Sequence, residues 1–170
     1  MIAERDGVVL RDAREADLLA IDELTALGYA AIQDSYVAML GADCYETTHA
    51  DPGQSWDERK AAQNRRLFCE HPEQVWVLDD DGGIFGYVTF WLFPERSYGH
   101  LDNSAVDPAR RNEGWATFMY RHVLDYFRAL GLRYAHVDTG LDDAHTPARR
   151  AYEAVGFDRS VPSVDLWRQL

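Results

Sequence analysis

Lysine is almost absent from this sequence. Of its 17 basic residues only Lys60 is a lysine, while 29 residues are acidic, so the formal net charge is −12 at pH 7. Nucleic-acid phosphates bind to basic surfaces, and the charge balance therefore argues against a nucleic-acid partner. An acidic surface attracts cationic small molecules at long range, and we expect a partner of that kind.

Cysteines and long apolar runs are also scarce. The only cysteines are Cys44 and Cys69, and without a secretory context they favour two free thiols in a reducing cytoplasm over a disulfide framework. No apolar run approaches the ~18 residues of a membrane span, and the start, MIAERDGVVLRD, is not a secretory signal. His49, His71 and His136 lack the spacing of metal ligands. These features predict a cytoplasmic protein with no membrane partner and no metal.

The chain has the length of one domain. Its 170 residues contain no repeat and no long linker, so we predict a single domain spanning residues 1–170. Apolar runs predict strands at residues 8–13, 74–80, 84–93, 100–106, 134–140 and 163–170. Helical spacing and composition predict helices at residues 14–28, 29–40, 56–70, 116–130 and 146–156, with a loop at 42–55. This mixed order indicates an α/β or α+β fold around one central sheet.

Particular residues set the expected boundaries and buried faces. Gly28 is expected to end the first helix and Gly41 the second, and Thr146 before Pro147 is expected to cap the last one. The turn at residues 81–83 predicts an antiparallel hairpin. In the first helix the apolar face is predicted to consist of Leu18, Ile21, Leu24 and Leu27. In the helix from residue 116 it is predicted to consist of Ala116, Met119, Tyr120, Val123, Phe127 and Leu130.

The segment VDPARRNEGWATF, residues 106–118, indicates a binding site for phosphate. A strand that passes through a proline turn into a helix aims unpaired backbone N–H groups and the positive end of the helix dipole at one point. Gly114 and Ala116 are small where a phosphate must approach the backbone, and Arg110 and Arg111 supply charged donors. The alternative is an ordinary capped helix with two solvated arginines.

Together with a later segment, ARRAYEAVGF at residues 148–157, this stretch resembles the GNAT superfamily of N-acetyltransferases. These enzymes move an acyl group from acyl-coenzyme A to an amine. The family's cofactor loop reads Arg or Gln, two residues, Gly, one residue, then Gly or Ala. It is matched by Arg111, Gly114 and Ala116, which follow the usual Val-x-Pro of Val106 and Pro108.

The later segment matches a second signature of the family. Its matching residues are Ala148, Tyr152, Glu153, Gly156 and Phe157. The order of strands and helices also agrees from Val8 to the C-terminus. The resemblance implies a GNAT-like domain with a mixed, mostly antiparallel sheet flanked by helices, and it implies acetyl-coenzyme A (acetyl-CoA) as co-substrate.

The resemblance also implies which residues contact the cofactor. They are Ala105, Val106, Arg110, Arg111, Asn112, Glu113, Gly114, Trp115, Ala116, Thr117 and His145. Three of them depart from the usual pattern. Asn112 stands where many members have glycine, although asparagine tolerates unusual backbone angles. Glu113 brings a negative charge close to the expected pyrophosphate, and His145 replaces a common asparagine.

The chemistry requires a proton donor and a proton acceptor. An aliphatic amine is protonated at neutral pH, and only its neutral form attacks a thioester. The resemblance places the general acid at Tyr152, whose alternative role is to pack the last helix on the sheet. For the base we favour Asp102, on the strand that leads into the cofactor loop. His100 has the more suitable ordinary pKa but lies further from the loop, and either residue is otherwise a plain strand residue.

The acceptor side is predicted from the resemblance alone. In the family it is built by the first helices and the loop between them, which implies Tyr29, Gln33, Tyr36 and residues 42–55 near the substrate. We predict transfer of acetyl to a small, cationic primary amine. Two alternatives stay open: acetylation of a protein or peptide α-amine, and a non-catalytic acyl-CoA sensor. The sequence is also compatible with a homodimer.

Overall fold

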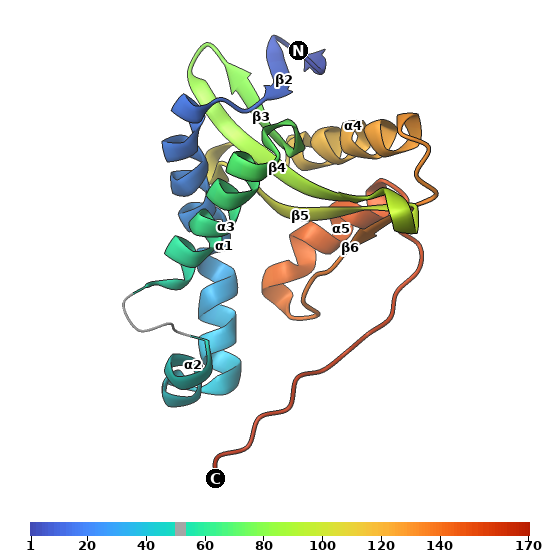
Figure 1. Cartoon of the computed structure of the whole chain (residues 1–170). Helices are drawn as coiled ribbons and strands as arrows, with labels where there is room; N and C mark the ends of the chain where they lie inside the picture. The colour runs from blue at the N-terminus through green and yellow to red at the C-terminus, as the bar shows by residue number, and fades with distance from the viewer. Residues whose placement is uncertain (50–53) are drawn as a thin grey trace.

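A computed structural model describes residues 1–49 and 54–170, and this part of the chain forms one six-stranded sheet (Figure 1). The order in the sheet follows the chain, from β1 to β6. Each neighbouring pair is antiparallel except β5 and β6, which are parallel, so the predicted mixed, mostly antiparallel sheet is confirmed. The strands are β1 (Ala3–Arg5), β2 (Val8–Asp12), β3 (Val75–Asp80), β4 (Gly83–Phe93), β5 (Tyr98–Val106) and β6 (Tyr134–Val137).

Helices cover both faces of this sheet. They are α1 (Leu18–Leu40), α2 (Ala42–Thr48), α3 (Trp56–Glu70), α4 (Trp115–Ala129) and α5 (Thr146–Ala154). Side chains alternate along β3, so Val75 and Val77 join a core cluster with α1 and α3, while Trp76 and Leu78 join a second cluster with α4. Figure 1 shows α1 and α3 on one side of the sheet and α4 on the other. No helix in the described part of the chain is long and apolar enough to cross a membrane.

The first helix is longer than predicted, because Gly28 does not end it. α1 continues through Gly28 to Leu40, with Gly41 following. A Cβ on Gly28 would lie 2.7 Å from the Cβ of Ala105, so the missing side chain lets α1 approach β5 closely. This contact also corrects the predicted face, since Leu27 is 55% exposed while Thr25 is buried.

Two predictions, for residues 42–55 and 163–170, were also wrong. Residues 42–48 form α2 rather than a loop, with Asp43 in its first turn near the positive end of the helix dipole. Residues 50–53 of that predicted loop lie outside the described residues. Residues 163–170 form no strand and are exposed. Leu166 and Trp167 are adjacent, so that segment offers no single apolar face to a sheet.

The last two helices differ slightly from the prediction. α4 begins one residue early, at Trp115, which is buried, and Leu130 is 48% exposed because the helix has already ended at Ala129. Thr146 lies inside the first turn of α5, with His145 at the N-cap position and no side-chain cap. The short strand β1 was not predicted, since three residues carry too little pattern.

Candidate active site

The site is centred on the part of β5 that β6 does not reach. The two strands pair from Tyr98 and Tyr134 to Leu101 and Val137, and β5 then continues to Val106 paired with β4 alone. In the described part of the chain no strand pairs with residues 102–106 on this side. Backbone groups alternate between the two sides of a strand, and the Asp107 N–H donates to the Phe85 carbonyl of β4. Of the two predicted contacts, Val106 therefore has backbone groups available to an extended ligand between the separating strands, while those of Ala105 face Tyr87 of β4. The Ala105 side chain is buried against Gly28 and is not available either.

The turn after β5 forms a cradle of backbone N–H groups. Asn112 and Gly114 both have positive φ, 64° and 81°, and α4 follows directly. The first helical bond runs from the Phe118 N–H to the Gly114 carbonyl at 2.9 Å, so the N–H groups of Trp115, Ala116 and Thr117 precede it without helical partners. Successive free N–H groups at a helix start fit a phosphate well.

The two arginines of this turn have different surroundings. Arg110 donates to Asp80 at 2.8 Å and to Glu113 at 3.2 Å, and its guanidinium lies 4.1 Å from the Phe85 ring centre. Arg111 is exposed and, among residues 1–49 and 54–170, its side chain has no hydrogen bond or ion pair. Arg111 is thus the arginine that is available to an anionic ligand, while Arg110 stabilises the turn through its contacts with Asp80 and Glu113.

Glu113 does not leave an uncompensated charge in the cradle. Its carboxylate accepts from the Trp115 indole at 2.8 Å and from Arg110. These two bonds lower the pKa of Glu113, so it stays ionised within an ion pair. Arg5, 3.9 Å from the Trp115 ring centre, donates to the Glu113 carbonyl at 2.7 Å. The Trp115 side chain is buried, which leaves only its backbone for a ligand.

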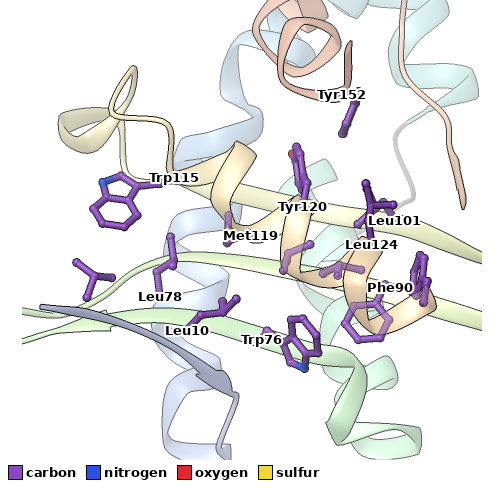
Figure 2. Close-up of a cluster of buried hydrophobic side chains, with 14 of the residues drawn as sticks. Leu10, Trp76, Leu78, Phe90, Leu101, Trp115, Met119, Tyr120, Leu124 and Tyr152 are labelled. Atoms are coloured by element: carbon purple, nitrogen blue, oxygen red, sulfur yellow. The ribbon is translucent and has the colours of Figure 1, made fainter. Parts of the chain in front are cut away.

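On the α4 side of β5, hydroxyl groups meet in an apolar setting. Ser104 and Tyr120 share a hydrogen bond of 2.7 Å, and the Tyr152 ring centre lies 5.0 Å from that of Tyr120. Figure 2 shows Tyr152 of α5 beside Tyr120 of α4 at the end of the core cluster. Burial, followed by the neighbouring Tyr120, raises the pKa of Tyr152 well above its ordinary value. Tyr152 therefore holds its proton at neutral pH and is a donor.

On the α3 side of β5, a bulge brings two consecutive polar residues together. Val88 pairs with Ser104 and Phe90 with Leu101, so Thr89 alone faces both Asp102 and Asn103. Asp102 accepts from the Trp91 indole at 3.2 Å, and the Asn103 amide donates to Asn64 of α3 at 3.0 Å. Without the bulge these neighbours would point to opposite faces.

The side chains around Asn103 form an aromatic and polar cluster between α1, α3 and β5. The Tyr29 hydroxyl donates to the side-chain oxygen Oδ1 of Asn103 at 3.2 Å and accepts from the Ser104 N–H at 3.2 Å. Lys60 donates to the same Asn103 oxygen at 3.2 Å, and its ammonium lies 5.8 Å from the ring centres of Tyr29 and Trp56. The structure thus brings Tyr29 to the bulge, as expected for an acceptor side.

The other predicted site residues lie on the C-terminal half of α1, in the turn before α5, and where β5 pairs with β6. Tyr36 makes an edge contact with the ring of His145, at 6.5 Å between centres. His145 is paired with Asp142, which also accepts from Ser35 of α1 at 2.7 Å. This holds the turn before α5 against the C-terminal half of α1. Gln33 is half-buried in that half of α1. His100 faces His136 at the paired end of the two strands.

Comparison with known proteins gives the family. A model of the acetyltransferase (GNAT) family matches residues 41–157, more than half of the chain. The chain belongs to the GNAT acetyltransferase family. This makes it an acetyl-CoA-dependent N-acetyltransferase. A search of curated proteins finds no match to this GNAT chain.

Solved structures agree on the fold of this GNAT protein. The ribosomal-protein-S18-alanine N-acetyltransferase of Escherichia coli is 16% identical, with a TM-score of 0.62 over 91% of this chain and 79% of that one. Spermidine N-acetyltransferase of Vibrio cholerae, with CoA and spermine, is 18% identical, with a TM-score of 0.61 over 92% and 84%. A GNAT acetyltransferase of Brucella melitensis with acetyl-CoA is 18% identical, with a TM-score of 0.58 over 93% of each chain.

The sequence did not indicate several residues that the structure places around β5. Tyr120 fits the apolar pattern of α4 and was assigned to the core, although its hydroxyl contacts Ser104. Asn64 and Lys60 lie in α3, whose many charged residues give no local sign of a contact with β5. Their positions depend on how α3 packs on the sheet, and no local pattern records that packing.

Proposed function

We propose that residues 1–170 act as one acyltransferase domain that moves acetyl directly from acetyl-CoA to the primary amine of a small, cationic acceptor. The observation that carries this proposal is the arrangement around the unpaired part of β5. A protonated phenol, Tyr152, lies on one side of the strand, and a carboxylate, Asp102, lies on the other. Direct transfer needs both groups at one reacting centre.

In this proposal the turn at residues 110–117 holds the pyrophosphate of CoA. The N–H groups that precede the first bond of α4 supply neutral donors, and Arg111 supplies a charged one. Arg110 and Glu113 shape the turn through their ion pair, and His145 fixes the turn before α5. The edge of β5 that faces away from β4 binds the pantetheine arm through the backbone of Val106.

Tyr152 is proposed as the general acid. When acetyl-CoA is bound it supplies a thioester, whose sulfur leaves as a thiolate when an amine attacks. A thiolate requires a proton, and the Tyr152 hydroxyl still carries one because burial raises its pKa well above 10. The surrounding core excludes water, which strengthens a hydrogen bond to the developing charge.

Asp102 is proposed as the group that receives the proton of the amine. Removing a proton from an amine with a pKa of ~10.4 at pH 7.4 costs about 4 kcal/mol without help. The Trp91 indole and the bulge hold the carboxylate on the face of β5 that Tyr29 and Trp91 line. A carboxylate there also attracts an ammonium group before it loses its proton.

A cationic acceptor fits this face better than a neutral one. The Lys60 ammonium lies 5.8 Å from the ring centres of Tyr29 and Trp56, and this contact supports an aromatic surface that suits an ammonium group. The spermidine acetyltransferase of similar fold supports the same class. The alternative acceptor is a protein α-amine, as in the S18-alanine acetyltransferase. Two free thiols, Cys44 and Cys69, support a cytoplasmic setting.

The proposal is tested by thiol release from acetyl-CoA with spermidine and with an alanine-terminated peptide as acceptors. We expect turnover with spermidine to exceed turnover with the peptide, and the reverse order would favour the alternative. Thermal unfolding with acetyl-CoA gives an independent measure of the cradle. Ligand at about 100 times its Kd adds about 2.7 kcal/mol, or roughly 5–10 °C. No shift at millimolar cofactor would contradict the assigned cradle.

A further inference from the structure

Three potential metal ligands meet where β5 and β6 still pair. His100 and His136 are direct neighbours in the parallel register, and their Nδ1 atoms lie 2.7 Å apart. Asp138 follows two residues later, with a carboxylate oxygen 3.5 Å from His100 Nε2. One ligand atom from each of the three side chains lies within 4.8 Å of the others. The spacing in the sequence hid this group, because His100 and His136 are 36 residues apart.

We propose that His100, His136 and Asp138 form a binding site for a divalent transition metal ion, with Zn²⁺ as the best match. Two imidazoles and one carboxylate are common zinc ligands, and three protein ligands leave a fourth position open to water. Neither the family match nor the proposed acetyl transfer assigns a role to this group. The inference does not rest on the proposed function.

The backbone holds the two histidines in place before any ion binds. Four consecutive residue pairs fix the register of β5 and β6 around them, from Tyr98 and Tyr134 onward. The ring of Tyr98 makes an edge contact with His136 at 6.3 Å between centres. Preorganised ligands lose little side-chain entropy when the ion binds, which favours affinity.

Only small movements are needed to reach coordination geometry. Two nitrogens that bind one zinc ion at ~2.0–2.1 Å in tetrahedral geometry lie about 3.4 Å apart. The Nδ1 atoms at 2.7 Å must therefore separate by roughly 0.7 Å. The Asp138 carboxylate lies beside Nε2 of His100, so it must turn toward the two Nδ1 atoms, and its side chain, which is 82% exposed, has room for this rotation.

The site is reachable from solvent. A surface hollow lined by Arg96, Tyr98, Tyr134, Ala135 and His136 opens beside it. His136 and Asp138 are both exposed. Two arginines lie near the hollow: the Arg96 guanidinium is 5.2 Å from the Tyr98 ring centre, and that of Arg133 is 5.8 Å from the Tyr134 ring centre.

The experiment uses the untagged chain after treatment with a chelator, titrated with ZnCl₂ by calorimetry, and with CoCl₂ by visible absorption. We expect one ion per chain and the absorption of tetrahedral Co²⁺. His136→Ala is expected to weaken Zn²⁺ binding at least tenfold, and Asp138→Asn to weaken it several-fold. The matched control His122→Ala changes a histidine on α4 that packs on Phe118 and lies outside the group, so it should bind like the unaltered chain.

The proposal is tested by metal binding alone, without a measurement of activity. Equal affinity in the unaltered chain, His136→Ala and Asp138→Asn would overturn it and assign the metal to other groups, such as the free thiols Cys44 and Cys69. No binding to the unaltered chain at millimolar Zn²⁺ would also overturn it. Asp138 is exposed, so its variant stays folded and keeps the test valid if His136→Ala does not.

Discussion

The two faces of β5 carry opposite kinds of chemistry. Toward α4 and α5, Ser104, Tyr120 and Tyr152 present hydroxyl groups among apolar side chains and carry no charge. Toward α1 and α3, Asp102 and Lys60 present charges among amides and aromatic rings. One strand separates a dry proton donor from a polar region able to receive a cation.

The largest expected effect comes from removing the donor. Tyr152→Phe should lower kcat about 100-fold, because a general acid contributes at least that much. The thermal shift with acetyl-CoA should stay unchanged, since the ring still packs. The measurement is kcat from thiol release beside unfolding with cofactor, and an unaltered kcat would remove Tyr152 from the mechanism.

Removing the base should have a smaller effect that depends on pH. Asp102→Asn should lower kcat/KM about tenfold at pH 7, since the amine then loses its proton without help. Below ~10.4 the neutral fraction of the amine rises tenfold per pH unit, so the defect should shrink as pH increases. The Tyr152→Phe defect should not shrink in this way. A profile of kcat/KM from pH 6.5 to 9.5 therefore distinguishes the role of Asp102 from that of Tyr152. An Asp102→Asn defect that stays constant with pH would contradict the assignment of Asp102 as the base.

The cofactor turn offers a matched pair of arginines. Arg111→Ala should weaken CoA binding about tenfold, because a hydrogen bond to a charged group contributes about 1.5–3 kcal/mol. Arg110→Ala should affect CoA affinity less and stability more, since Arg110 is engaged with Asp80 and Glu113. Calorimetry with CoA compares the two variants directly. Greater loss in Arg110→Ala would reverse the roles given to them.

The smallest expected effect concerns Lys60. Its ammonium repels a cationic acceptor on the α3 side, so Lys60→Ala should lower KM for spermidine about threefold and leave kcat nearly unchanged. Lys60→Arg is the matched control, because it keeps the charge. A higher KM in Lys60→Ala would indicate instead that Lys60 contacts an anionic part of the acceptor.

Local patterns predicted the elements that form the cofactor side. The hairpin of β3 and β4, the amphipathic helix α4 and the turn before it follow from short segments, and Asn112 takes the positive φ that asparagine tolerates. The acceptor side depends on contacts between distant segments. Gly28 reads as a helix end in sequence, and only its contact with Ala105 explains why α1 continues. The group of Asn103, Asn64 and Lys60 and the pair of His100 and His136 likewise depend on packing and register.

Because of the bulge opposite Thr89, the number of residues in β5 is more constrained than the identities of those residues. Several side chains along the strand tolerate exchange for others of similar size, because the ladder with β4 does not depend on them. Deleting Asp102 or Asn103 would restore a regular ladder and leave only one polar side chain facing α3. We therefore expect that a change of acceptor arises from substitutions in β5, which keep its number of residues. Insertions and deletions are expected only in segments outside β5.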